Sequence, residues 1–131
     1  MVDKNMPKNA YTEEEVTLCT YGALYNDTDF GGIDEIYRIK NRSISSIKMK
    51  ISNIAAMLDE EGIYRESKVS PLTGTPKGHG ARRTDWGIVK NLVLQSKSGL
   101  LELCINIVKS ENIKKPHSEE DVKKTTSAKL P

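Results

Sequence analysis

The stretch from Ser43 to Asp59, SISSIKMKISNIAAMLD, constrains the fold more than any other part of the chain. At about 100° per residue, four apolar side chains of this stretch fall within about 60° of one another on a helix. Four small or flexible side chains point the opposite way. The apolar set is Ile47, Ile51, Ile54 and Leu58, and the opposite set is Ser45, Met49, Ser52 and Ala56. The pattern predicts a helix that buries one face only.

The outer side of this helix carries groups that form hydrogen bonds or bear positive charge. Ser43 or Ser45 can cap the first turn. Lys48 and Lys50 lie on the two shoulders of the outer face, and Asn53 lies between that face and one shoulder. A small polar surface flanked by positive charge is suited to reading the major groove of DNA.

The length and composition are those of one small domain with a modest core, at 131 residues, 37% hydrophobic and a net charge of +2. The charge is unevenly spread, because residues 65–83 hold five basic residues against one glutamate, a net +4 in nineteen residues. Proline and glycine interrupt any helical period over residues 63–84. This region is predicted to be a long basic loop, in which Ile63-Tyr64 and Lys68-Val69 are candidates for short strands. Connections of this length are usually functional or disordered.

Two further helices are predicted before the central one. The first runs from Tyr11 to Asn26, with Thr12 and Glu15 forming a capping box. Its apolar stripe is thin and consists of Val16, Cys19 and Ala23, widened by Tyr21, Leu24 or Tyr25. The second helix covers residues 33–39 and directs Ile36 and Ile39 to the core.

The C-terminal part predicts one or two helices. Asp85 is placed to cap a helix from Trp86 to about Ser96, and Trp86 is expected to anchor the end of the basic loop in the core. Lys97-Ser98-Gly99 is a candidate interruption. The apolar face that continues to about Ile113 belongs to a fifth helix or to an extension of the fourth; its members are Leu100, Leu103, Cys104, Ile107 and Val108.

These elements together predict a mainly α-helical fold, with a three-helix core resembling a helix-turn-helix, a long basic loop and one or two C-terminal helices. We expect a flexible N-terminus over residues 1–8, a single domain over residues 9–113 and a disordered tail over residues 114–131. No signal peptide and no apolar run long enough to cross a bilayer is visible, so a cytoplasmic protein without membrane contact is expected.

The sequence YTEEEVTLCTY, followed by a short helix and NRSISSIKMKISNIAAMLDEEG, resembles the N-terminal region of many bacterial HNH-type restriction endonucleases and related uncharacterised proteins. The first helix is also loosely similar to Myb-type domains. The resemblance covers residues 11–62 and is carried by Arg42-Ser43, Ser46, Met49-Lys50 and Asn53. It implies a DNA-binding module that serves restriction or a related function. It does not imply cleavage, because the clustered histidines of an HNH site are not present.

The predicted partner is therefore double-stranded DNA. The residues expected to contact it are Arg42, Ser43, Ser45, Ser46, Lys48, Met49, Lys50, Ser52, Asn53, Lys77, Arg82 and Arg83. The alternative is a protein-interaction module or accessory subunit of a defence system, in which the outer helix face and the C-terminal helix meet a second copy or another protein. The serine and lysine side chains of the outer face also have a simpler interpretation, in which they only solvate an exposed helix and bind no partner.

No catalytic group, cofactor site or metal site is predicted. The phosphate-binding pattern G-x-x-x-x-G-K-[ST] is absent, and no Ser, His and Asp set is visible. Cys19, His79, Cys104 and His117 lack the spacing of a zinc site. The two cysteines fall in apolar-periodic segments, and we expect both to be small buried hydrophobic residues without a disulfide.

Overall fold

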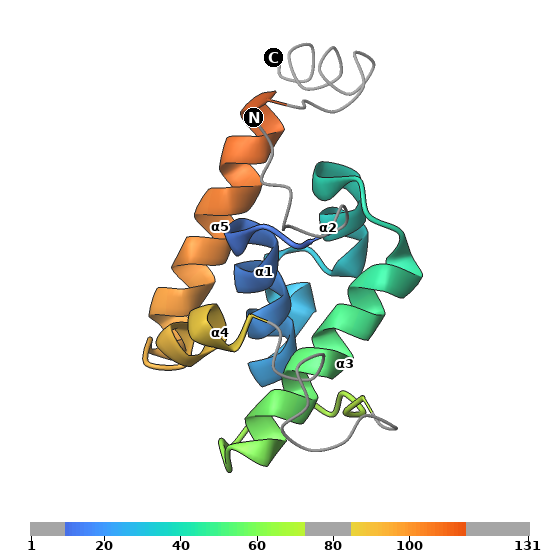
Figure 1. Cartoon of the computed structure of the whole chain (residues 1–131). Helices are drawn as coiled ribbons and strands as arrows, with labels where there is room; N and C mark the ends of the chain where they lie inside the picture. The colour runs from blue at the N-terminus through green and yellow to red at the C-terminus, as the bar shows by residue number, and fades with distance from the viewer. Residues whose placement is uncertain (1–9, 73–84, 115–131) are drawn as a thin grey trace.

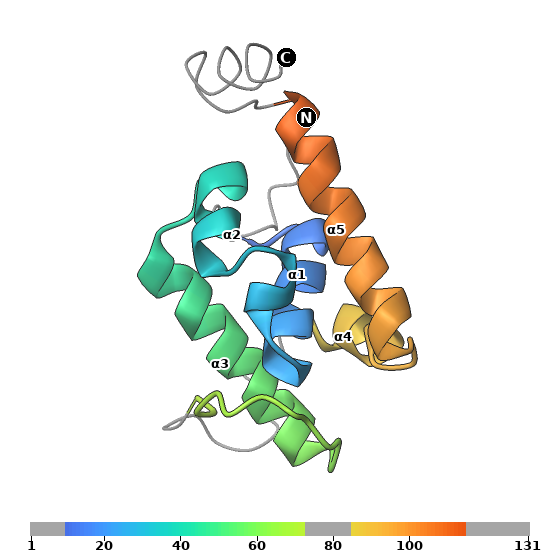
Figure 2. The same ribbon diagram turned by 180° about the vertical axis from the view of Figure 1, so that it is seen from behind.

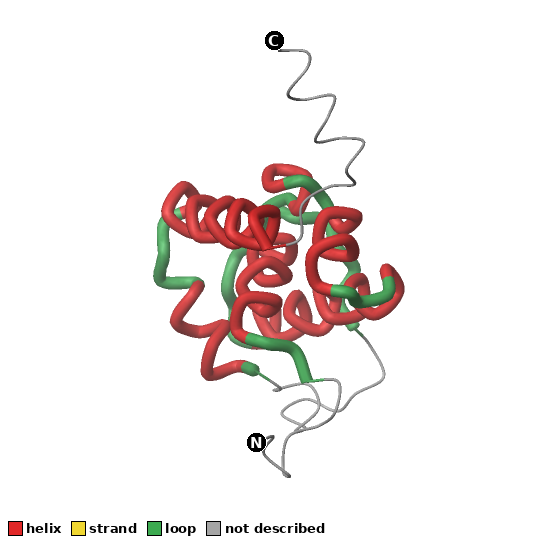
Figure 3. Tube along the Cα trace, turned by 90° about the horizontal axis from the view of Figure 1, so that it is seen from above, coloured by secondary structure: helices red, strands yellow, loops and turns green. Residues whose placement is uncertain are grey.

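The computed structural model describes residues 10–72 and 85–114. These residues form helices α1 (Glu13–Leu24), α2 (Ile33–Lys40), α3 (Ile44–Glu60), α4 (Trp86–Leu92) and α5 (Lys97–Lys114), with a 3-10 turn, η1 (Asp27–Phe30), between α1 and α2. The prediction of a mainly helical chain is confirmed (Figure 3). Ile63-Tyr64 and Lys68-Val69 are not strands, and no other strand occurs in the described ranges.

Helix α1 is the centre of the fold and lies between α3 and α5 (Figures 1 and 2). Its capping box forms as predicted: the Thr12 hydroxyl accepts from the Glu15 N–H at 3.2 Å, and the Glu15 carboxylate accepts from the Thr12 N–H at 2.7 Å. Every residue from Glu15 to Leu24 is buried, because α3, α4 and α5 all pack against this helix. The predicted apolar stripe was therefore too narrow, since α1 faces neighbours on all sides. The helix is also shorter at both ends than the predicted range of residues 11–26.

Helices α2 and α3 are joined by a tight connection of three residues. Asn41 ends α2 in the left-handed region with φ 57°, a conformation that asparagine tolerates better than most residues. Ser43 then caps α3, with its hydroxyl accepting from the Ser46 N–H at 3.1 Å. Ile36 and Ile39 of α2 are fully buried, as predicted.

The two halves of α3 have different surroundings. The predicted apolar face is confirmed, because Ile47, Ile51, Ile54 and Leu58 are all buried. In the second half, however, the outer side is buried as well: Asn53 is 7% exposed and Ala56 is 3% exposed. The chain that follows α3 returns along it, and the Leu72 N–H donates to the Ser52 carbonyl at 2.9 Å. The prediction that this helix buries only one face is therefore correct for the first half of α3 and wrong for the second half.

The C-terminal part forms two helices. Helix α4 ends at Leu92, earlier than the predicted Ser96. Asp85 does precede α4, but it has φ 69° and makes no side-chain capping bond. Helix α5 starts at Lys97, so residues 97–99 begin this helix and do not interrupt one; the Ser96 hydroxyl accepts from the Gly99 N–H at 3.0 Å.

The core joins all five helices and contains both cysteines. Cys19 and Cys104 are fully buried, as predicted, and burial raises the pKa of each thiol to about 12. They are therefore uncharged hydrophobic side chains at neutral pH. Trp86 is half-buried and packs against the core, in agreement with its predicted anchoring role. None of the described helices combines the length and the apolar character needed to cross a membrane.

Candidate nucleic-acid interface

The first half of α3 presents a continuous row of side chains to solvent. Ser45 and Lys48 are exposed, Met49 is 61% exposed, and Ser52 is half-buried at the end of the row. These four positions are spaced i, i+3, i+4 and i+7, which places them on one helix face. We call this row the α3 outer face. It offers two hydroxyls, one ammonium group and one thioether, a combination that can bond to base edges and contact apolar groups such as a thymine methyl.

Arg42 lies next to this face but is directed into the molecule. Its Nε donates to Glu15 Oε2 at 2.9 Å, and its Nη2 donates to Glu15 Oε1 at 2.8 Å and to the Ala10 carbonyl at 2.6 Å. The hydrogen bond to Glu15 raises the pKa of the guanidinium. Arg42 thus joins the start of α1 to the connection between α2 and α3, which fixes the direction in which α3 leaves that connection.

Tyr11 fills the space between Arg42 and Lys50. The Arg42 guanidinium lies 4.0 Å from the centre of the Tyr11 ring, and Lys50 Nζ lies 5.4 Å from it, both within the range of a cation–π contact. The Tyr11 hydroxyl shares a hydrogen bond of 2.6 Å with the hydroxyl of Ser46. Burial raises the pKa of Tyr11, even though the bond to Ser46 and the charge of Arg42 lower it.

Lys50 is paired with Asp85, the residue that precedes α4. Its Nζ donates to Asp85 Oδ2 at 2.6 Å, and the two side chains are only 10% and 20% exposed. This contact explains why the Asp85 carboxylate does not cap α4. Of the two lysines of α3, Lys50 is therefore held internally, while Lys48 is exposed with no ion pair among the described contacts.

The described chain on either side of residues 73–84 is attached to α3, at Leu72 and at Asp85. On a helical projection, Ser52 lies toward the Lys48 shoulder and Lys50 forms the opposite shoulder. The Leu72 N–H bonds to the Ser52 carbonyl, at the end of the outer face, and Asp85 bonds to Lys50 on one shoulder. Lys77, Arg82 and Arg83 belong to the sequence between these two attachments and lie outside the described residues.

The predicted site residues thus fall into three groups. The structure brings Ser45, Lys48, Met49 and Ser52 together on the α3 outer face. Five others have structural contacts: Ser43 caps α3, Ser46 bonds to Tyr11, Asn53 is buried, and Arg42 and Lys50 are ion-paired. Lys77, Arg82 and Arg83 form the third group and are outside the described ranges.

Sequence reasoning missed the partners that hold this region in place, namely Tyr11, Glu15 as an ion-pair partner, and Asp85. The capping box gave a signal that the Glu15 carboxylate would lie at the start of α1. Nothing signalled its pairing with Arg42, which is 27 residues away, or that of Lys50 with Asp85, which is 35 residues away.

The described residues include no group of three or more His, Cys, Asp or Glu side chains that could hold a metal ion. Comparison with protein-family models, with curated proteins and with solved structures finds no match. The function is therefore argued from the geometry and the chemistry of the side chains.

Proposed function

We propose that this chain binds double-stranded DNA, with the α3 outer face directed into the major groove. The observation that carries the proposal is the α3 outer face itself, a row of two hydroxyls, one ammonium group and one thioether on a single helix face. Ser45, Lys48 and Met49 are exposed and Ser52 is half-buried. The sequence between Leu72 and Asp85, two residues that bond to α3, contains Lys77, Arg82 and Arg83. In a DNA-binding protein, hydroxyl, ammonium and apolar groups on a helix face can contact bases, and arginine and lysine side chains can contact phosphates.

The local geometry adds two supports. Arg42, Tyr11 and Glu15 hold the connection before α3 rigidly, and a reading helix requires such a fixed orientation because base recognition depends on placement. Met49 is 61% exposed on the same face, where its side chain can contact a thymine methyl. The resemblance to the N-terminal region of HNH-type restriction endonucleases favours the same function.

Within this proposal, the roles of the predicted residues differ. The α3 outer face reads the groove, and Lys77, Arg82 and Arg83 contact phosphates. Arg42, Ser43, Ser46, Lys50 and Asn53 support the interface from inside, because their side chains already have partners or are buried. A restriction-associated role is part of the same proposal, and no catalytic role is assigned to the chain.

The proposal is tested by the salt dependence of binding to a random-sequence duplex, measured by fluorescence anisotropy. The variant Arg82→Ala/Arg83→Ala removes two cations from the basic stretch. Each lost phosphate contact reduces the slope of log K against log salt by about 0.9, so we expect the slope to decrease by about 1.8.

The matched control is Lys90→Ala/Lys109→Ala, which removes two exposed lysines of α4 and α5. This variant should retain nearly the slope of the wild type. If both double variants bind equally well with equal slopes, the basic stretch does not contact phosphates. If the wild type fails to bind the duplex at low salt, DNA binding itself is rejected.

The second candidate function is a protein-interaction module. It is favoured by one specific observation, the large exposed fraction of Met49 on an otherwise polar helix face. A mass measured by gel filtration, together with an electrophoretic shift on random duplex DNA, separates the two candidates. A dimer that shifts the duplex supports DNA binding, and a monomer that gives no shift at low salt argues against both.

A further inference from the structure

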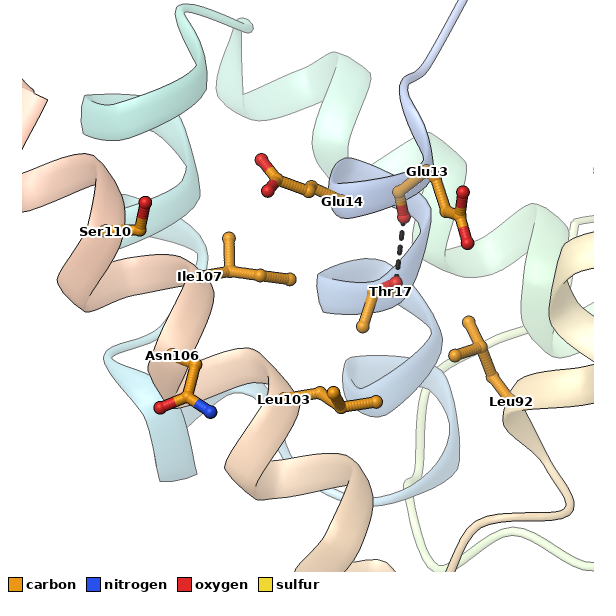
Figure 4. Close-up of a pocket in the computed structure, with 8 residues that line it drawn as sticks. All are labelled: Glu13, Glu14, Thr17, Leu92, Leu103, Asn106, Ile107 and Ser110. Carbon is orange, nitrogen blue, oxygen red and sulfur yellow. Dashed lines mark hydrogen bonds between the residues drawn. The ribbon is translucent and has the colours of Figure 1, made fainter.

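A shallow groove of ≈ 360 Å³ opens where the first turns of α1 emerge between α4 and α5 (Figure 4). Its floor is apolar and consists of Leu92 from α4, Leu103 and Ile107 from α5, and the methyl group of Thr17 from α1. The Thr17 hydroxyl donates to the Glu13 carbonyl at 2.8 Å, which turns the polar end of this side chain back onto its own helix. We call this feature the α1/α5 groove.

The floor of the groove is only partly covered by the protein itself. Leu103 is 40% exposed and Ile107 is half-buried, whereas Leu100 and Cys104 on the same helix are fully buried. Helix α5 was predicted to turn one apolar face to the core. In the structure the core covers only part of this apolar face, and Leu103 and Ile107 remain accessible in the groove. Removing this apolar surface from water would stabilise a complex.

The rim on the α1 side has an excess of negative charge. Glu13 is exposed and has no ion pair among the described contacts. Glu14 bonds to Lys40 Nζ at 2.7 Å, but the same ammonium also bonds to Glu111 at 2.9 Å. Lys40 is therefore shared between Glu14 and another carboxylate, and the exposed Glu13 adds a negative charge beside Glu14.

The rim on the α5 side is polar and uncharged. Asn106 and Ser110 are both exposed and both line the groove, one turn apart on α5. Neither makes a side-chain hydrogen bond among the described contacts. These groups are available to a partner's backbone or side chains.

From these contacts we propose that the α1/α5 groove binds a basic amphipathic helix of another protein, which places one or two aliphatic side chains on the floor and a Lys or Arg beside Glu13 and Glu14. The apolar floor between two helices suits the helix-in-groove mode of recognition. The carboxylates of Glu13 and Glu14 favour a basic partner, because they would repel an acidic segment bound at the same rim. This inference does not rest on DNA binding, since none of the groove residues belongs to α3.

A library of random helical peptides displayed on phage tests this proposal. The full chain is the target, and the selected peptides are then compared on two variants. Leu103→Asp places a charge on the groove floor. Leu94→Asp makes the same change at a leucine that is 81% exposed and does not line the groove. Thermal unfolding of both variants checks that they remain folded.

We expect the enriched peptides to combine Leu, Ile or Met with Lys or Arg. Their affinity should decrease about tenfold or more on Leu103→Asp, as for the central contact of an interface, and change less than about twofold on Leu94→Asp. Glu13→Lys should weaken the same peptides. The proposal is overturned if no enriched peptide is sensitive to Leu103→Asp, or if the sensitive peptides are neutral or acidic.

Discussion

Arg42 joins the start of α1 to the connection between α2 and α3 through one planar group. Its guanidinium binds both carboxylate oxygens of Glu15, the carbonyl of Ala10 and the face of the Tyr11 ring. Lysine could not make all of these contacts, because it has neither the fork of donors nor the flat face. The Glu15 side chain is 4% exposed, so its charge depends on this partner.

We expect Arg42→Met to lower the free energy of unfolding at pH 7 by about 3 kcal/mol, because it leaves the buried Glu15 carboxylate without its cation. Burial raises the pKa of Glu15, but hydrogen bonds from Arg42 and Thr12 outweigh it, so that the pKa lies below its ordinary 4.5. A carboxyl group whose pKa is lower in the folded chain than in the unfolded chain stabilises the fold fully at a pH above the unfolded-state pKa. This stabilisation is lost as the pH falls through the folded-state pKa. Chemical denaturation between pH 7 and pH 3 should therefore show a smaller acid loss for Arg42→Met than for the wild type.

Arg65→Met is the matched control for this residue. Arg65 also binds both oxygens of a carboxylate, that of Asp59, but the Asp59 side chain is 44% exposed. Its loss should cost about 1 kcal/mol or less. Equal losses for the two variants at pH 7 would show that burial of Glu15 does not matter. Arg42→Lys provides a milder variant if Arg42→Met does not fold.

At the scale of the elements, Gly22 sets how closely α1 and α3 approach. A Cβ at this position would lie 3.3 Å from Ile51 Cδ1 and 3.3 Å from Asp27 Cβ. Gly87 in α4 is the opposite case, because a Cβ there meets nothing within 4 Å. One glycine thus serves packing between helices, and the other only weakens its own helix.

The two glycines give a direct prediction. Gly87→Ala should stabilise the fold by about 0.5 to 1 kcal/mol, through the higher helix propensity of alanine and the smaller entropy of the unfolded chain. Gly22→Ala should give no such gain, since the added methyl group presses on α3. Thermal and urea unfolding of the two variants measure the difference. A comparable gain at both positions would contradict the close contact between α1 and α3.

Short-range sequence features predicted most of the helices, but they did not predict which segments pack against each helix. The Thr12 and Glu15 capping box, the Ser43 cap and the isoleucine period of α3 are short-range features, and all are present in the structure. The burial of α1 on all sides, and of Ala56 on the outer side of α3, depends on segments that are distant in the sequence. The carboxylate of Asp85 was misassigned for the same reason, because Lys50 competes for it from another helix.

At the scale of the whole molecule, the central helix α1 separates two surfaces of different character. Helix α3, which carries the α3 outer face, lies on one side of α1, and α5 lies on the other (Figures 1 and 2). The α1/α5 groove is lined by α1, α4 and α5 and includes no residue of α3. Lys40 ties α2 to both α1 and α5 through Glu14 and Glu111. Burial lowers the pKa of Lys40, but these two hydrogen bonds outweigh it and raise the pKa, so the lysine remains charged at neutral pH. The surface proposed for DNA and the groove proposed for a protein partner therefore belong to different helices.

The central claim is that α3 faces DNA. It is tested most directly by mapping the amide signals of the ¹⁵N-labelled full chain in NMR spectra while a short random-sequence duplex is added at low salt. We predict that the largest shifts occur at Ser45, Lys48, Met49 and Ser52 and at the two attachments, Leu72 and Asp85, while the signals of the α1/α5 groove stay in place. Shifts confined to the groove, or no shifts at all, would exclude α3 as the DNA-binding element.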